Sequence, residues 1–151
     1  MLDQILFIDD DPITLMLCKK VIIKSSFSNK IITAQNGEEA LSYFNTFRYT
    51  KNKPNEHPQL IFLDLNMPKK NGIECLHEIK ANKRFYDIAI AIYSTSSSEE
   101  HIEETFICGA NIYIKKPSDF NELKKTLSYV VTLNWQYHTS GLNRDNFLLR
   151  L

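Results

Sequence analysis

Charged and hydroxyl side chains follow four separate apolar segments of this sequence, each at the point where the segment ends. They are Asp9 and Asp10 after the first segment, then Asp64, Ser94 and Lys116 after the others. Carboxylates that lie close together repel one another unless a cation lies between them. Oxygen ligands of this kind suit a hard divalent ion, Mg²⁺ foremost and Mn²⁺ as the alternative. The pattern predicts a divalent-metal site if these segment ends converge.

Asp64 is the candidate nucleophile of this set, because the apolar segment QLIFL before it is typical of a strand in the middle of a sheet. A carboxylate that attacks a phosphoryl group forms an aspartyl phosphate, a known covalent chemistry. The Ser94 hydroxyl could donate a hydrogen bond to a phosphoryl oxygen, and the Lys116 ammonium could pair with it. Each residue alone is more often a cap or a solvated turn residue than a functional one. Their joint occurrence favours phosphoryl chemistry.

The elements that must position these residues alternate between strand and helix. Apolar runs predict strands at 4–8, 30–34, 59–65, 87–93 and 111–114, and helices begin after Asp11, Asn36, Gly72, Ser97 and Asp119. Such alternation indicates a single α/β domain with a mostly parallel sheet. In sheets of this kind, functional groups gather at the carboxyl ends of the strands.

Helix and loop boundaries follow from a few residues. Asp11, with Pro12 after it, is the predicted N-cap of the first helix, which separates it from the metal-binding acids. Ser97 and Glu100 have capping-box spacing, and Gly109 is placed to end the same helix. Residues 48–58, with two prolines, predict a long loop.

Composition excludes several classes of protein. The 151 residues carry 18 basic and 18 acidic side chains, so the net charge is zero and favours neither nucleic acid nor an anionic membrane as partner. No apolar stretch has the length of a membrane span, and the N-terminus does not have the pattern of a signal peptide. The three cysteines are widely spaced and predict reduced thiols in a cytoplasmic protein.

Four motifs resemble the receiver domain of two-component response regulators, of the chemotaxis-regulator type. They are FIDDDP (7–12), FLDLNMPKKNG (62–72), IYSTSSS (92–98) and GANIYIKKPSDF (109–120), in that order and at matching intervals. The resemblance covers roughly residues 2–133. It implies a doubly wound, flavodoxin-like domain with a five-stranded parallel sheet in the order 2-1-3-4-5 and five helices.

The resemblance also implies roles for individual residues. Asp64 would be the phosphoacceptor. Mg²⁺ would be bound by Asp9, Asp10, Asp64 and the backbone carbonyl of Asn66. Ser94 stands where threonine is commoner and would contact the phosphoryl group, Lys116 would pair with it, and Tyr113 would be the rotating switch aromatic. A cis Lys116–Pro117 bond is expected in such a fold. From the residues alone, a tyrosine in a short strand such as Tyr113 is more often half-buried packing than a switch.

The predicted organisation is a receiver domain at 1–133 and a C-terminal tail at 134–151 without an effector domain. The predicted function is a stand-alone phosphorelay regulator, not an enzyme in the usual sense, that takes a phosphoryl group from a histidine kinase or histidine phosphotransfer protein. It would assist its own phosphorylation and slow dephosphorylation. The long loop and the apolar tail resemble stand-alone regulators that serve phytochrome-type kinases. The tail could pack on the domain or mediate a homodimer.

Two other classes remain open at this point. An aspartyl-phosphate hydrolase would need a second acid two residues after its nucleophile, where this chain has Asn66. A receiver-like binding module that is never phosphorylated would not need Asp64, Ser94 and Lys116 together.

Overall fold

Strands and helices alternate along the chain, as the sequence predicts. The structure, a computed structural model, describes residues 2–24, 28–45, 58–67, 71–85, 87–133 and 144–149. In chain order its elements are β1 (Leu2–Ile8), α1 (Pro12–Lys24), β2 (Ser28–Ala34), α2 (Gly37–Asn45), β3 (Leu60–Leu63), α3 (Gly72–Ala81), β4 (Ala89–Ser94), α4 (Glu99–Cys108), β5 (Ile112–Lys115), α5 (Phe120–Thr132) and the short α7 (Arg144–Phe147). Most of the predicted long loop at 48–58, and the tail residues 134–143, lie outside the described residues.

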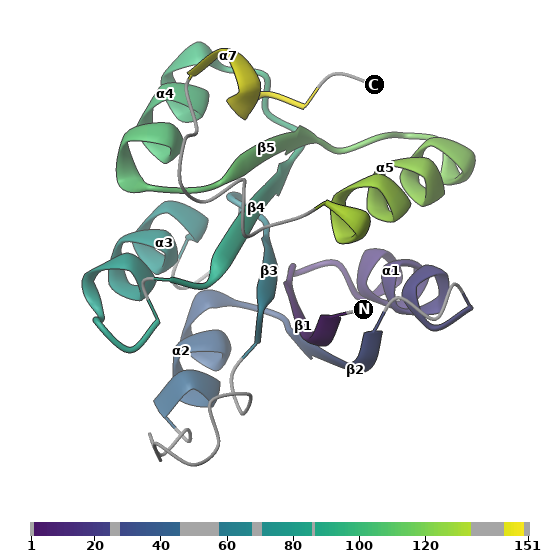
Figure 1. Cartoon of the computed structure of the whole chain (residues 1–151). Coiled ribbons are helices and arrows are strands. Elements are labelled where there is room, and N and C mark those ends of the chain that lie inside the picture. The colour runs from purple at the N-terminus through teal and green to yellow at the C-terminus, as the bar shows by residue number, and fades with distance from the viewer. Residues whose placement is uncertain are drawn as a thin grey trace.

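The five strands form one parallel sheet in the order β2-β1-β3-β4-β5, which confirms the predicted flavodoxin-like topology. Helices α1 and α5 cover one face of the sheet, and α2, α3 and α4 cover the other (Figure 1). Because every crossover between parallel strands is made by a helix, both faces of the sheet are buried.

Alternating side chains of the central strands fill the two layers of the core. In β1, Ile5 and Phe7 point to the α1 and α5 side, and Leu6 and Ile8 point to the opposite side. The ring of Phe7 stacks on Phe62 of β3, with 4.5 Å between ring centroids. This two-residue periodicity fixes the register, since a slip by one residue would exchange the two faces.

The register of β1 and β3 brings the acidic segment ends together. Ile8 and Leu63 are paired residues, so Asp9 and Asp64 follow at the same level of the sheet. The Asp64 N–H donates to the Ile8 carbonyl at 2.9 Å, which continues the ladder by one residue. The carboxylates are therefore placed by backbone pairing.

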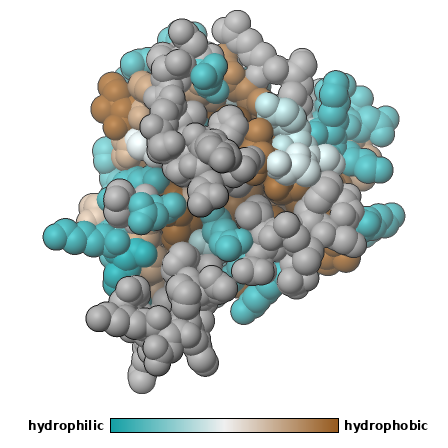
Figure 2. Space-filling model, viewed as in Figure 1, coloured by the Kyte–Doolittle hydropathy of each residue, from teal (hydrophilic) through white to brown (hydrophobic). Residues whose placement is uncertain are grey.

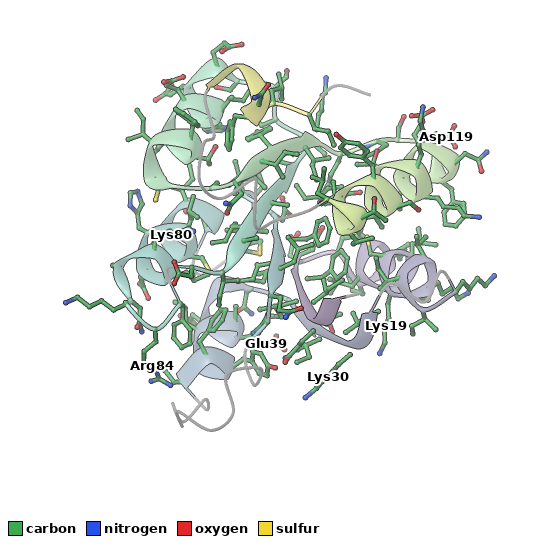
Figure 3. All side chains as sticks on the ribbon, in the orientation of Figure 1. Lys19, Lys30, Glu39, Lys80, Arg84 and Asp119 are labelled. Carbon is green, nitrogen blue, oxygen red and sulfur yellow. The ribbon has the colours of Figure 1, made fainter. Side chains whose placement is uncertain are left out.

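Two predicted caps are confirmed at helices that flank this edge of the sheet. Asp11 accepts the Ile13 N–H at 3.0 Å and the Thr14 hydroxyl at 2.8 Å, at the start of α1. Asp119 accepts the Asn121 N–H at 2.9 Å at the start of α5, where Figure 3 labels it. Asp11 is thus a capping residue, as the sequence predicts.

Helix α4 begins one residue later than predicted and ends at the predicted glycine. The N-cap is Ser98, whose hydroxyl accepts the His101 N–H, so the predicted Ser97–Glu100 capping box is wrong by one residue. Adjacent serines have nearly the same capping propensity, and Ser96 decides between them because its hydroxyl accepts the Ser98 N–H at 3.2 Å. Gly109 ends α4 with φ of 102°, the left-handed conformation that was expected there.

Hydrophilic side chains project from the margins of the molecule, and hydrophobic ones show between them (Figure 2). Among the described residues, no helix is long and apolar enough to cross a membrane.

Candidate functional site

Three carboxylates form a cluster at the carboxyl ends of β1 and β3. Asp9 and Asp64 are buried, with 3% and 4% of their surface exposed, and Asp10 is exposed to solvent. One oxygen from each carboxylate lies within 4.8 Å of the other two. The structure therefore brings together the three acids that the sequence predicts to meet.

Lys116 reaches this cluster from the residue after β5. Its Nζ lies 2.7 Å from Oδ2 of Asp9 and 3.4 Å from Oδ2 of Asp64. The Lys116 N–H donates to the Ser94 carbonyl at 2.8 Å, which fixes the start of the side chain beside the end of β4. The ammonium also lies 5.3 Å from the centre of the Tyr93 ring. Lys116 thus links three strand ends.

The charges of the cluster depend strongly on burial and on one another. Burial raises the pKa of Asp64, Lys116 opposes the rise, and the neighbouring Asp9 adds to it. Burial alone would lower the pKa of Lys116, but its hydrogen bond to Asp9 and the charges of Asp64 and Asp9 raise that pKa overall. The site is therefore short of positive charge, because one ammonium faces three carboxylates.

The carboxylate cluster fits a small divalent ion. Mg²⁺ binds oxygens at about 2.0–2.1 Å, so two oxygens on one ion are at most about 4.2 Å apart. The spread of 4.8 Å between the carboxylate oxygens is close to this limit and needs only small side-chain movements. Oxygen donors are also the ligand type that such ions prefer.

Ser94 and Asn66 lie at the ends of the two central strands. Ser94 is fully buried, and its hydroxyl oxygen accepts the Ser96 N–H at 3.1 Å. The Asn66 N–H donates to Oδ1 of Asp64 at 3.3 Å. Asn66 thus contacts the cluster directly, and Ser94 is linked to it by the backbone of Lys116. The roles predicted for the Ser94 hydroxyl and the Asn66 carbonyl stay predictions.

Tyr113 of β5 is fully buried, and its hydroxyl donates to the Ser96 carbonyl at 2.8 Å. Tyr113 is therefore held inside the core in this structure, and its role as a rotating switch stays a prediction. The Lys116–Pro117 bond is trans, so the expected cis bond is wrong. The two isomers of a prolyl bond differ by only about 0.5–1 kcal/mol, so the surrounding packing decides between them.

Gly72 is a positioning residue that the sequence reasoning did not single out. A Cβ at Gly72 would lie 2.1 Å from the Asp64 carbonyl oxygen and 2.6 Å from the Leu65 Cα. Only glycine lets the start of α3 approach the backbone of the candidate phosphoacceptor this closely. The Asn-Gly pair at 71–72 is the available sequence signal for a tight backbone approach here.

Comparison with known proteins agrees with this geometry. Residues 5–128 match the family model of the response regulator receiver domain. The response regulator Rcp1 of Synechocystis sp. is 31% identical over 121 residues, covering 80% of this chain and 81% of Rcp1. The probable methanogenesis regulatory protein FilR2 of Methanothrix harundinacea is 29% identical over 126 residues, covering 83% of this chain and 79% of FilR2.

Solved structures show the same architecture. The phosphorylated cyanobacterial phytochrome response regulator RcpA superposes with a TM-score of 0.75 at 28% identity, covering 85% of this chain and 90% of RcpA. The Mn²⁺-bound form of response regulator Rcp1 gives a TM-score of 0.76 at 25% identity, covering 93% of this chain and 97% of that one. With its acidic cluster at the carboxyl edge of the 2-1-3-4-5 sheet, the chain belongs to the family of response regulator receiver domains of two-component systems.

Proposed function

We propose that this chain is a phosphorelay switch that accepts a phosphoryl group on Asp64 with the help of a divalent cation. Receiver domains of response regulators interact with histidine kinases or phosphotransfer proteins, and one of these is the proposed donor. The observation that carries the proposal is the buried Asp64 in one cluster with Asp9, Asp10 and the ammonium of Lys116.

The transfer follows from the position of Asp64. One carboxylate oxygen forms a bond to the phosphorus of the donor's phosphohistidine while the P–N bond breaks, and the electron pair of that bond stays on the imidazole. Asp64 becomes an acyl phosphate. The Asn66 N–H and the Lys116 ammonium, already in contact with the carboxylate, hold it in place during attack.

The remaining residues balance charge on the transferred group. Asp9, Asp10, Asp64 and the Asn66 carbonyl are the proposed ligands of Mg²⁺ or Mn²⁺, which would supply positive charge against the phosphoryl oxygens. The Mn²⁺-bound form of Rcp1 is a related structure with such an ion. Ser94 would donate its hydroxyl hydrogen to a phosphoryl oxygen, and Lys116 would pair with another.

Phosphorylation would act through the loop after β4. It adds roughly one negative charge and three acceptor oxygens next to Ser94. A pull on Ser94 moves the loop whose Ser96 carbonyl receives the Tyr113 hydroxyl. Slow hydrolysis of the acyl phosphate would reset the switch, and this self-dephosphorylation is the limit of the proposed enzymatic activity.

The surroundings of the switch are also part of the proposal. A cytoplasmic location fits the free thiols of Cys18, Cys75 and Cys108. The proposed partners are the phosphoryl donor and a downstream protein. A second copy of the chain, in a homodimer, is a further proposed partner. Nucleic acid and membrane are not among the proposed partners.

The test is incubation with acetyl phosphate and Mg²⁺, followed by the mass of the intact protein. We expect one added phosphoryl group, lost in Asp64→Asn and retained in Asp119→Asn, a matched control whose new amide can still cap α5. An adduct that persists in Asp64→Asn, or none on the natural chain, would contradict the proposal. Repeated turnover of phosphate esters would favour the hydrolase instead.

A further inference from the structure

The C-terminal segment 144–149 extends the sheet at its β5 edge. Leu148 forms a parallel bridge with Tyr113, and the Leu149 N–H donates to the Tyr113 carbonyl at 2.9 Å. Figure 1 shows α7 lying beside α4, next to β5. In the strand order β5 is an edge strand, and edge strands carry backbone groups that can pair with another segment. The segment therefore occupies a pairing position that the sheet would otherwise present to solvent.

Phe147 anchors this segment in the core next to the switch aromatic. It is fully buried, and its ring centroid lies 6.2 Å from that of Tyr113 and 5.2 Å from that of Phe106 on α4. Tyr113 in turn donates its hydroxyl hydrogen to the Ser96 carbonyl, and the Ser96 N–H donates to the Ser94 hydroxyl. A continuous series of contacts thus joins Phe147 to Ser94.

We propose that segment 144–149 is an internal ligand of the β5 edge that holds Tyr113 in its buried position and thereby favours the phosphorylated form of Asp64. The coupling rests on the proposed function. The Tyr113 ring cannot leave Ser96 without disturbing the rings packed around it, and Phe147 is one of them. Docking of the segment therefore disfavours any other orientation of Tyr113.

Phosphorylation and docking favour the same arrangement of the loop after β4. The phosphoryl group draws Ser94, and the docked segment holds Tyr113 against the Ser96 carbonyl two residues later. When two events favour one state, each strengthens the other by the same factor. The segment is thus an activating element of the switch, and phosphorylation tightens its docking.

The first test does not depend on phosphorylation. Chemical modification of Tyr113 by tetranitromethane, measured by peptide mass, should be several-fold faster in Phe147→Ala than in the natural chain. The matched control Phe120→Ala removes an exposed ring from α5 and should leave the rate unchanged. Leu149→Pro, which removes the N–H bonded to the Tyr113 carbonyl and keeps the Phe147 ring, should act like Phe147→Ala. Equal rates in all four proteins, each checked for folding by its melting temperature, overturn the docking role.

The second test measures the coupling. With acetyl phosphate and Mg²⁺, we expect several-fold less phosphorylated protein for Phe147→Ala and Leu149→Pro, and an unchanged amount for Phe120→Ala. In the natural chain, hydrogen exchange of the Leu149 amide should slow at least several-fold on phosphorylation. No adduct on the natural chain overturns the proposed function and the coupling with it. An adduct that both tail variants retain in full overturns the coupling alone.

A third test, at several protein concentrations, shows whether the segment bound at the β5 edge belongs to the same chain or to a second copy. An internal ligand gives Leu149 protection that is independent of protein concentration. Protection that rises with concentration, together with a dimer in sedimentation, would show that the segment of a second copy occupies the edge and would overturn the internal arrangement.

Discussion

Lys116 and Asp9 form a partly buried ion pair, 2.7 Å between Nζ and Oδ2, across 107 residues of sequence. The pair joins the edge strand β5 to the central strand β1, and the same ammonium lies 3.4 Å from Asp64. Among the described residues, Lys116 is the only cationic side chain that contacts the acidic cluster. Its removal leaves two carboxylates buried without a cation.

Lys116→Ala should therefore lower the free energy of unfolding in the absence of metal by about 1–3 kcal/mol, because buried charges lose their partner. Added Mg²⁺ should restore more stability to this variant than to the natural chain. Urea unfolding with EDTA and with Mg²⁺ measures both effects. The exposed Lys19 on α1, labelled in Figure 3, offers the control Lys19→Ala, for which a change beyond about 0.5 kcal/mol is not expected.

The neighbouring acids Asp10 and Asp11 should respond differently to Mg²⁺. Asp10 belongs to the carboxylate cluster, whereas Asp11 caps α1. In Asp10→Asn the rise of the melting temperature with Mg²⁺ should be largely lost, because a ligand that binds only the folded state stabilises it less as its affinity falls. In Asp11→Asn that rise should remain, since asparagine also caps helices. Equal loss in both variants would contradict the assignment of separate roles.

Gly72→Ala should destabilise the fold by about 2–4 kcal/mol, because the new Cβ meets the backbone of Asp64 and Leu65 and neither can move freely. Gly109→Ala is the contrasting variant. Its Cβ would have only ordinary contacts with the Lys80 side chain, and the positive φ alone costs about 1 kcal/mol. Thermal or urea unfolding compares the two. A smaller loss for Gly72→Ala than for Gly109→Ala would contradict the close approach described here.

Stability should fall at alkaline pH because of Cys18. Burial first, and Asp9 to a smaller degree, raise the pKa of this thiol to about 12, with Lys116 opposing. Well below pH 9 the thiol is protonated in both states and contributes no pH dependence. Between about pH 9 and 12 the unfolded chain loses the proton and the folded chain keeps it, so the unfolded state gains stability. Burial of Tyr93 raises its pKa as well and acts in the same direction.

Urea unfolding at several pH values between 8 and 11 measures this decline. The slope of the unfolding free energy against pH should be shallower in Cys18→Ala. It should change less in Cys108→Ala, whose thiol is only half-buried. An identical slope in the natural chain and in Cys18→Ala would exclude the buried thiol as the cause.

The order of the strands and helices, and the positions of the acids at the strand ends, can be predicted from local sequence patterns. The continuous apolar runs of β1 and β3 can be recognised without a structure, because a strand covered by helices on both faces of the sheet buries every side chain. Asp9 and Asp64 end such strands, and parallel strands end at one edge of the sheet. Asp11 and Asp119 are capping residues for local reasons, since a cap bonds to an N–H only a few residues away.

Which side chains meet across long separations in the sequence depends on the packing of the whole domain. That Lys116 pairs with Asp9 more closely than with Asp64 depends on the packing of β5 against β4 and of β1 against β3. The choice of Ser98 over Ser97 as N-cap depends on the Ser96 hydroxyl, and the need for glycine at position 72 depends on the backbone of Asp64. The docking of Phe147 on Tyr113 has no local signal either. Contacts of this kind depend on how the helices and strands pack in three dimensions, and neither residue of such a pair carries that information alone.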